Sequence, residues 1–288
     1  MVERLSLFLF GRNPELTMKS KIYLLIVSCF VSVSVFAQTP KAIEADLLRS
    51  FKRIDYWATL RGNQRSSNDI TLYERLNDSL EKANTEFGKK LQYYTAKYPS
   101  TINQKFTSIA QKINSSPKDQ LQIVTSADGL FRIYSWDVRS DGSEYGFDNV
   151  IQYKSGNNTI SKWVDDPIVN NEHQYVNYYD SIYTLKVQGK TYYLAVYSAA
   201  YTHLEFGQGI QIFAIENGKL NDDVKLIKTL TGLHSQLYCE YIYTDGKENI
   251  YYDATSKTIH IPIVIEHGKV TKRYITYKFT GQYFEKVK

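Results

Sequence analysis

The spacing of apolar residues changes once along this chain, near Pro117, and this change sets the fold class. Before Pro117, apolar side chains recur every three or four positions, which is the spacing of one face of an α-helix. After Pro117 they alternate with polar side chains, the period of two that a half-buried β-strand requires. The sequence therefore predicts a helical region over residues 38–117 and an antiparallel β domain over residues 118–288.

The helical region contains three apolar stripes, over residues 43–57, 73–98 and 102–113. Thr71 and Glu74 have the spacing of a capping box at the start of the second stripe. Short connections between the stripes favour antiparallel packing of the helices. We expect the stripes to form core contacts, not a cofactor site.

The β region is punctuated by turn dipeptides, among them Ser155-Gly156, Gln188-Gly189 and Asn217-Gly218. Glycine supplies the positive φ that tight hairpin turns need. About twelve strands at a spacing of about 8–12 residues are typical of an antiparallel meander. The predicted fold class is α+β, with N-terminal antiparallel helices followed by a large antiparallel β-meander domain, sandwich or propeller-like.

Three stretches of the β region are loosely alike, at residues 121–164, 178–226 and 237–287. Their length is typical of a propeller blade, but a closed propeller has about four to eight blades, so the sandwich and the propeller-like arrangement both stay open. Pro262 lies inside the run from Ile259 to Ile265 and cannot donate a ladder hydrogen bond. This strand should therefore be an edge strand or contain a bulge.

The segment from Met18 to Ala37 has the order of regions found in a secretory signal peptide. Lys19 and Lys21 precede an apolar run of about 15 residues. A membrane-spanning helix needs about 20 apolar residues, so this run is too short for one. Ala37 is a small residue at the expected cleavage position. We interpret residues 1–17 as an extension from a start codon assigned too early, and we expect an exported protein, periplasmic or secreted.

Cys29 offers an alternative to this cleavage. Residues 26–29 resemble a permissive lipobox, and lipidation of Cys29 would anchor the protein in the outer membrane. Membrane attachment is expected only in that case. If Cys29 is removed with the signal peptide, Cys239 is the one remaining cysteine, so neither an intrachain disulfide nor a cysteine-based zinc cluster can form.

The composition gives little support for nucleic-acid binding, because the net charge of +5 is spread along the chain. Tyrosine is the unusual residue: of the 25 in the chain, 19 follow residue 119. Tyrosine rings pack well on pleated sheets while their hydroxyl groups remain hydrated. We expect most of them to pack between strands; an aromatic surface for a glycan or peptide is the alternative.

No segment carries a strong catalytic, metal or cofactor motif, and no cofactor is expected. The five histidines form neither an HxH nor an HExxH pattern. His203 and Glu205 would share one strand face, but no third metal ligand can be named. Cys239 is expected to be a buried, inert thiol.

Two clusters combine a tryptophan with carboxylates near a strand end. One consists of Trp136, Asp137 and Asp141, and the other of Trp163, Asp165 and Asp166. Aromatic rings flanked by carboxylates suit sugars or cationic peptides. Such clusters also occur wherever a core strand simply meets a loop.

Two stretches, Asp128 to Asp137 (DGLFRIYSWD) and Asn149 to Lys154 (NVIQYK), resemble a pattern in uncharacterised secreted proteins of Gram-negative bacteria. The resemblance extends to Tyr277–Phe284 and includes little of the helical region. It implies the β architecture and an exported location. It implies no activity, because none is established for that group.

The leading functional hypothesis is an exported, non-enzymatic binding protein of the cell envelope or extracellular space, with a glycan, peptide or protein as partner. The expected binding residues are Trp136, Asp137, Asp141, Trp163, Asp165, His203 and Glu205. One alternative is a periplasmic hydrolase whose site assembles only in three dimensions. His203 and Glu205 are the first candidates for its site residues. The other is an envelope structural or assembly factor that docks through its helices.

Overall fold

The computed structural model describes residues 39–64, 69–110, 121–139, 146–164, 168–169, 172–173, 177–200, 205–242 and 248–287. The signal segment and Cys29 lie outside these residues. Residues 44–288 cluster into one compact unit, separate from residues 1–43, and all packing discussed below belongs to the larger unit. Among the described residues, no helix combines the length and the apolar character needed to cross a membrane.

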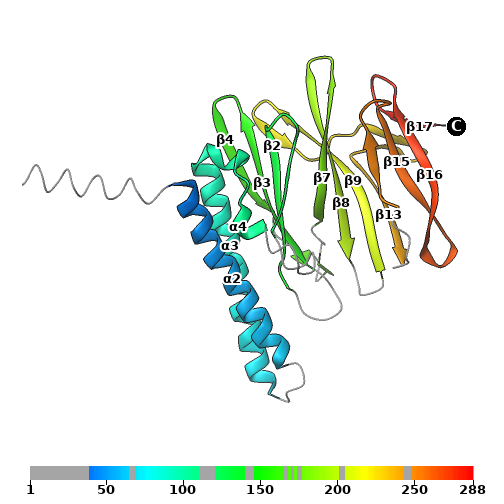
Figure 1. Cartoon of the computed structure of the whole chain (residues 1–288). Helices are drawn as coiled ribbons and strands as arrows, with labels where there is room; N and C mark the ends of the chain where they lie inside the picture. Colours follow the sequence, from blue (N-terminus) through cyan, green and yellow to red (C-terminus); the bar gives the residue numbers. More distant parts are fainter. Residues whose placement is uncertain are drawn as a thin grey trace, which may run out of the picture. The chain divides into compact units, whose positions relative to one another are not determined.

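Two long helices form an antiparallel pair (Figure 1). They are α2 (Pro40–Asn63) and α3 (Ile70–Lys97). Lys90 of α3 donates to Asp46 near the start of α2 at 3.0 Å, whereas Arg61 near the end of α2 donates to Asn77 near the start of α3 at 3.1 Å. These contacts run in opposite directions along the two helices, so the predicted antiparallel packing is confirmed.

The capping prediction for the second helix was wrong. Asp69, not Thr71, caps α3, because the Asp69 carboxylate accepts a hydrogen bond from the backbone N–H of Leu72 at 2.9 Å. Helix α3 therefore begins one residue before Thr71, and Thr71 lies inside its first turn. Asp and Thr are both good capping residues, and spacing alone could not choose between them.

The third predicted helix is broken into two short pieces. They are the 3₁₀-helix η2 (Pro99–Asn103) and the four-residue α4 (Thr107–Ala110). Phe106, between them, has a φ of +49° and interrupts the helical geometry. Ile113 lies outside the described residues.

The β region that the structure describes forms three open, mostly antiparallel sheets and a two-stranded ribbon. Sheet 1 contains, in spatial order, β1 (Gln122–Thr125), β2 (Phe131–Asp137), β3 (Phe147–Ser155) and β4 (Asn158–Val164). Sheet 2 contains β10 (Lys219–Asn221), β9 (Glu205–Glu216), β8 (Lys190–Ala200) and β7 (Tyr178–Val187), and β13 (Gln236–Ile242) also pairs with β9. The ribbon pairs β5 (Ile168–Val169) with β6 (Glu172–His173).

Sheet 3 lies at the C-terminal side of the chain. Its order is β12 (Gly232–His234), β11 (Ile227–Thr229), β17 (Phe284–Lys286), β16 (Lys269–Phe279), β15 (Thr258–Ile265) and β14 (Tyr251–Asp253), and the 3₁₀-helix η4 (Glu266–Gly268) links β15 to β16. The pairing of β11 with β17 is parallel, and every other pairing is antiparallel. The register of β15 shifts between Pro262 and Val264, so the predicted bulge at this proline is confirmed.

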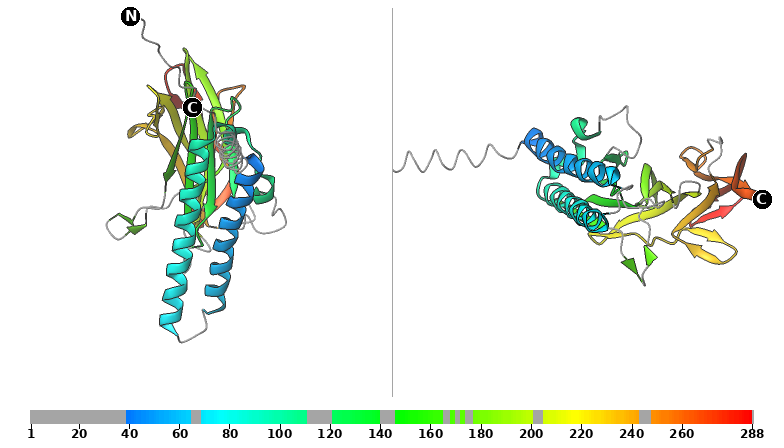
Figure 2. Two further views of the ribbon diagram at one scale, coloured as in Figure 1. Left: turned by 90° about the vertical axis from the view of Figure 1, so that its left-hand side faces the viewer. Right: turned by 90° about the horizontal axis from the view of Figure 1, so that it is seen from below.

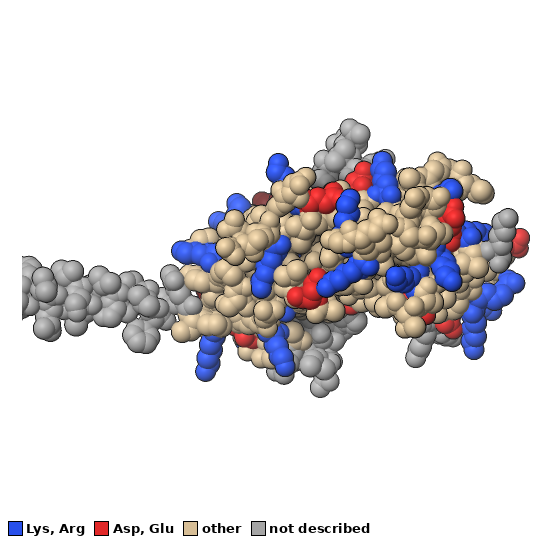
Figure 3. Space-filling view, turned by 90° about the horizontal axis from the view of Figure 1, so that it is seen from above, with Lys and Arg blue, Asp and Glu red and all other residues tan. Residues whose placement is uncertain are grey.

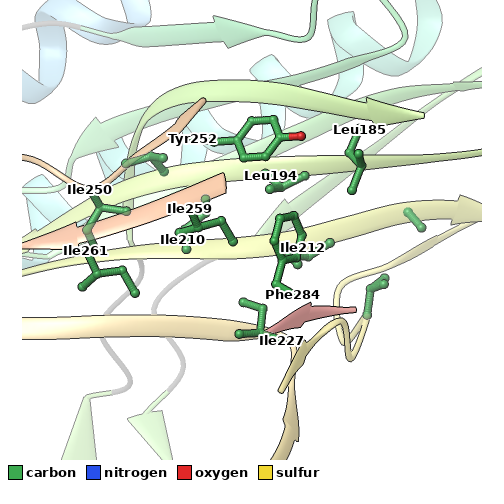
Figure 4. Packing of buried hydrophobic residues seen from close by; sticks show 13 residues of the cluster. Leu185, Leu194, Ile210, Ile212, Ile227, Ile250, Tyr252, Ile259, Ile261 and Phe284 are labelled. Atoms are coloured by element: carbon green, nitrogen blue, oxygen red, sulfur yellow. The ribbon is translucent and has the colours of Figure 1, made fainter. Parts of the chain in front are cut away.

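The helices and the three sheets pack in sequence order, as Figures 1 and 2 show. Strand alternation explains this stacking, because each strand of sheet 2 sends successive side chains to opposite faces. Tyr193 and Phe213 pack with sheet 1 residues such as Phe131. Leu194 and Ile212 of the same strands pack with sheet 3 in a second hydrophobic core (Figure 4).

The predicted α+β class, with N-terminal helices followed by antiparallel strands, is confirmed. The three loosely similar stretches match the three sheets with two exceptions. Strand β13, from the third stretch, joins sheet 2, and β11 and β12 of sheet 3 lie between the second and third stretches. The sheets pack face to face and are not closed. Face-to-face packing of meander sheets is common to sandwiches and to propeller blades.

Candidate ligand-binding groove

The two ends of sheets 1 and 2 differ in the connections between their strands. At the hairpin end, tight turns at residues 128–129, 156–157, 188–189 and 217–218 join consecutive strands. At the opposite end, which we call the loop end, β2, β4 and β8 finish, and β3 and β9 begin. The sequence-predicted binding residues that the structure describes, Trp136, Asp137, Trp163 and Glu205, lie toward the loop end.

Trp136 is buried between sheet 1 and α3. Its side chain is fully inaccessible, its indole N–H donates to Asn84 Oδ1 at 3.2 Å, and its ring packs edge-on against Phe87 at 5.1 Å between ring centroids. Asp137, the next residue, is also buried, and its carboxylate accepts from the backbone N–H of Arg139 at 2.7 Å. Trp136 is thus part of the core and presents no ring face to a ligand.

The other predicted residues are not gathered into one site by the described contacts. Trp163 is half-buried and lies against α3, where a Cβ on Gly88 would come within 2.7 Å of its ring. Glu205 is exposed at the start of β9. Asp141, Asp165 and His203 lie outside the described residues.

Seven residues of the conspicuous DGLFRIYSWD stretch form a buried strand, β2. All seven residues of β2 are buried. Arg132 inserts its guanidinium among backbone oxygens, donating to the carbonyls of Thr101 and Gln104 at 2.7 Å each, and Tyr134 donates to Gln152 Oε1 at 2.9 Å. Burial raises the pKa of Tyr134 to about 12, so this hydroxyl remains a neutral hydrogen-bonding group. The motif therefore holds the helices to sheet 1.

A groove of about 660 Å³ lies at the hairpin end, between the turns of sheets 1 and 2. Its lining comes from one segment of sheet 1 and two segments of sheet 2, together with Leu130: residues 154–156, 189–193 and 214–218. This volume lies within the range of about 300–1,000 Å³ that is usual for ligand pockets. No residue of the groove belongs to the sequence-predicted set.

Tight turns fix the walls of the groove. Gln188 and Gly189 have φ values of +50° and +76°, and Asn217 and Gly218 have values of +51° and +81°. Two consecutive positive φ values define type I′ turns, whose twist matches that of the flanking strands. Gly156, with a φ of +58°, supplies the third turn. Each turn is short, so the side chains beside it project from well-defined backbone positions.

The floor of the groove is held by aromatic packing. Tyr193 stacks on Phe131 of sheet 1 at 4.8 Å between ring centroids, and its hydroxyl donates to Asp128 Oδ2 at 3.2 Å. Burial raises the pKa of Tyr193, and the neighbouring Asp128 carboxylate raises it further. Tyr193 therefore joins the two sheets beneath the groove as a neutral donor.

The charged lining of the groove is mainly basic. Lys154 and Lys190 line it together with one carboxylate, Glu216, which accepts from Asn221 Nδ2 at 2.9 Å. Within the described part of the chain, neither lysine has an ion-pair partner. Figure 3 looks onto the hairpin end and shows lysine and arginine side chains spread over this face, with acidic side chains among them.

The remaining groups with possible chemistry are the metal-ligating side chains and the thiol of Cys239. Among the described residues, no three His, Cys, Asp or Glu side chains stand close enough to hold a metal ion. Cys239 of β13 is half-buried, and burial raises the pKa of its thiol to about 11. At neutral pH this thiol is protonated and therefore a poor nucleophile.

Sequence reasoning missed the groove because it ranked tryptophans and carboxylates above turn residues. A signal was present: Lys190 and Lys219 directly follow the glycines of two hairpin turns, and Lys154 lies two residues before Gly156. Only the pairing of the sheets shows that these turns lie at one end. Comparisons with protein-family models, with curated proteins and with solved structures found no match.

Proposed function

We propose that this protein is an exported, non-enzymatic binding protein that receives its ligand in the hairpin-end groove. The observation that carries the proposal is an open groove of about 660 Å³ between the hairpin turns of sheets 1 and 2. Lys154 and Lys190 have no described ionic partner and are available to a ligand. The lining contains one carboxylate and neither histidine nor cysteine.

Export is the second part of the proposal and is supported by the sequence. Met18 to Ala37 has the regions of a signal peptide, with lipidation at Cys29 as the alternative. Mass spectrometry of the mature N-terminus tests this directly. A chain beginning at Gln38 supports cleavage, a lipidated Cys29 supports anchoring, and an intact residue 1–37 segment contradicts export.

Ligand binding can be tested by filling the groove. Thr191→Trp places a large ring among the lining residues, and Thr276→Trp places the same ring on β16, outside the groove. We would screen the mature protein by thermal shift against neutral sugars, acidic sugars and peptides. The proposal predicts a stabilising ligand whose effect disappears with Thr191→Trp and persists with Thr276→Trp. Binding that is equal in both variants would contradict the assignment to this groove.

A further inference from the structure

We propose that the outer face of sheet 3 carries a second binding site, in which Tyr251 stacks on a neutral pyranose ring of a glycan. This site is separate from the hairpin-end groove and does not depend on it. The inner face of sheet 3 packs on sheet 2 through residues such as Tyr252 and Ile259. Side chains alternate along a strand, so the neighbouring Tyr251 and His260 point to the outer face. No described helix or sheet covers this face (Figure 1).

Three aromatic side chains form a cluster on this outer face: Tyr251, His260 and Tyr274. Tyr251 and His260 lie directly opposite each other in the β14–β15 ladder, and their rings stack at 4.5 Å between centroids and 10° between planes. Tyr274 of β16 packs edge-on against both rings, at 5.6 Å from Tyr251 and 6.0 Å from His260. Its hydroxyl donates to Glu248 Oε2 at 2.9 Å. These contacts hold the Tyr251 ring in one orientation.

One face of the Tyr251 ring is left for a ligand. His260 covers the other face, and β14 is the last strand on this side of sheet 3. Tyr251 is 39 % exposed, and within the described residues neither its hydroxyl nor the His260 ring nitrogens have a hydrogen-bond partner. The face of an aromatic ring is electron-rich. The axial C–H bonds of a pyranose carry a small positive charge, so the two surfaces attract each other.

The charged side chains beside the aromatic cluster are of both signs, which favours a neutral ligand. A row of outer-face residues begins two positions after Tyr251 and crosses five strands in register: Asp253, Thr258, Lys278, Glu285 and Lys228. Its two carboxylates and two ammonium groups give no excess of one charge that would attract an ion. Carboxylates accept hydrogen bonds and ammonium groups donate them, so the row can bind sugar hydroxyl groups of either role.

A peptide strand or a second copy of the chain fits this surface less well. Strand β14 spans only Tyr251–Asp253, so its free edge offers few main-chain groups to an added peptide strand. A stable protein interface buries about 800 Å² on each partner around an apolar centre. The described surface beside Tyr251 is instead a small aromatic cluster next to charged side chains, which matches the size and the mixed polarity of one sugar ring.

The test measures binding of neutral and charged trisaccharides by isothermal titration calorimetry. Triacetylchitotriose, cellotriose and maltotriose are the neutral probes, whereas deacetylated chitotriose is cationic and trigalacturonate is anionic. At least one neutral probe should bind with a Kd of about 1 mM or lower. Its affinity should be equal at about 0.01 M and about 1 M salt, because salt does not screen an uncharged ligand. Absence of binding by every neutral probe, or tighter binding of a charged probe that depends on Tyr251, would overturn the proposal.

Variants of Tyr251 assign the binding to the aromatic cluster. Tyr251→Leu keeps an apolar side chain on the edge strand but removes the ring, and should weaken binding about tenfold. Tyr251→Phe restores the ring and should recover most of that loss. Tyr238→Leu removes a 59 % exposed ring from β13 of sheet 2 and is the matched control, for which the affinity should be unchanged. Equal losses in Tyr251→Leu and Tyr238→Leu would overturn the proposal.

The outcomes also separate this site from the groove. If Tyr251→Leu removes binding of the neutral probe and Thr191→Trp does not, the binding site is the outer face of sheet 3. If Thr191→Trp removes it and Tyr251→Leu does not, the glycan occupies the groove. In that case the proposal for sheet 3 is wrong and the proposed function stands.

Discussion

Strand β2 stands out in the sequence but is buried in the structure, whereas the hairpin-end groove is open but is formed by ordinary turn segments. Strand β2 contains seven residues of the conspicuous DGLFRIYSWD stretch, and all seven are buried. The groove is built from ordinary turn segments, yet it presents two lysines, Lys154 and Lys190, that have no described ionic partner. A dense group of aromatic and charged residues in a sequence can therefore indicate a closely packed core. Groups that bind a ligand can lie in turns whose sequence gives no such signal.

The physical reason lies in the position of each region within the stack. Strand β2 is covered by the helices on one face and by sheet 2 on the other, so every side chain needs a partner of matching shape or polarity. The turns at the hairpin end are limited only by their backbone angles. Changes in β2 should therefore alter stability, and changes in the groove should alter binding.

The largest expected effect is that of Trp136→Ala. Removing this buried ring leaves a cavity beside Phe87 and an unpaired amide oxygen on Asn84, so the free energy of unfolding should fall by about 3–5 kcal/mol. Urea denaturation measures this loss. Tyr238→Ala, which truncates a 59 % exposed ring on β13, is the control and should cost far less. Equal losses would contradict the core assignment of Trp136.

A smaller effect is expected where Trp163 meets α3. Gly88→Ala would place a Cβ 2.7 Å from the Trp163 ring, and such overpacking typically costs about 1–3 kcal/mol. Gly62→Ala, in a helical position with open space around it, should instead be neutral or stabilising by up to about 1 kcal/mol.

A double-mutant cycle sharpens this prediction. In a Trp163→Ala background the clash is removed, so Gly88→Ala should no longer lower the free energy of unfolding. If the cost of Gly88→Ala were the same in both backgrounds, the close approach of Trp163 would not be its cause. In that case Trp163 would again be a candidate for an exposed ligand platform.

The smallest predicted change concerns the rim of the groove. Gln188 has a φ of +50° at the first position of its turn, where Asn217 stands in the related turn. Asparagine tolerates this backbone conformation better than glutamine does. Gln188→Asn should therefore raise the free energy of unfolding by about 0.5 kcal/mol, and Asn217→Gln should lower it by a similar amount. Thermal unfolding of the two variants, with opposite shifts expected, measures the effect.

Much of the fold could be predicted from sequence because periodicity depends on local burial. The change from helical to alternating spacing near Pro117 located both regions, and glycine dipeptides located the turns at Gly156, Gly189 and Gly218. The broken third helix could not be foreseen, because Phe106 adopts a positive φ that is rare for a bulky residue. The site could not be predicted because its lining comes from turns far apart in sequence, which only sheet pairing and packing bring together.

The most direct test of the central claim is a map of backbone amide shifts on addition of a ligand that stabilises the mature protein in the thermal-shift screen. If the groove is the binding site, the perturbed amides should belong to residues 154–156, 189–193 and 214–218. The amides of β2 around Trp136 and those near Glu205 at the loop end should remain unperturbed. Perturbations concentrated at the loop end, with an unchanged hairpin end, would contradict the groove and favour the residues first suggested by the sequence.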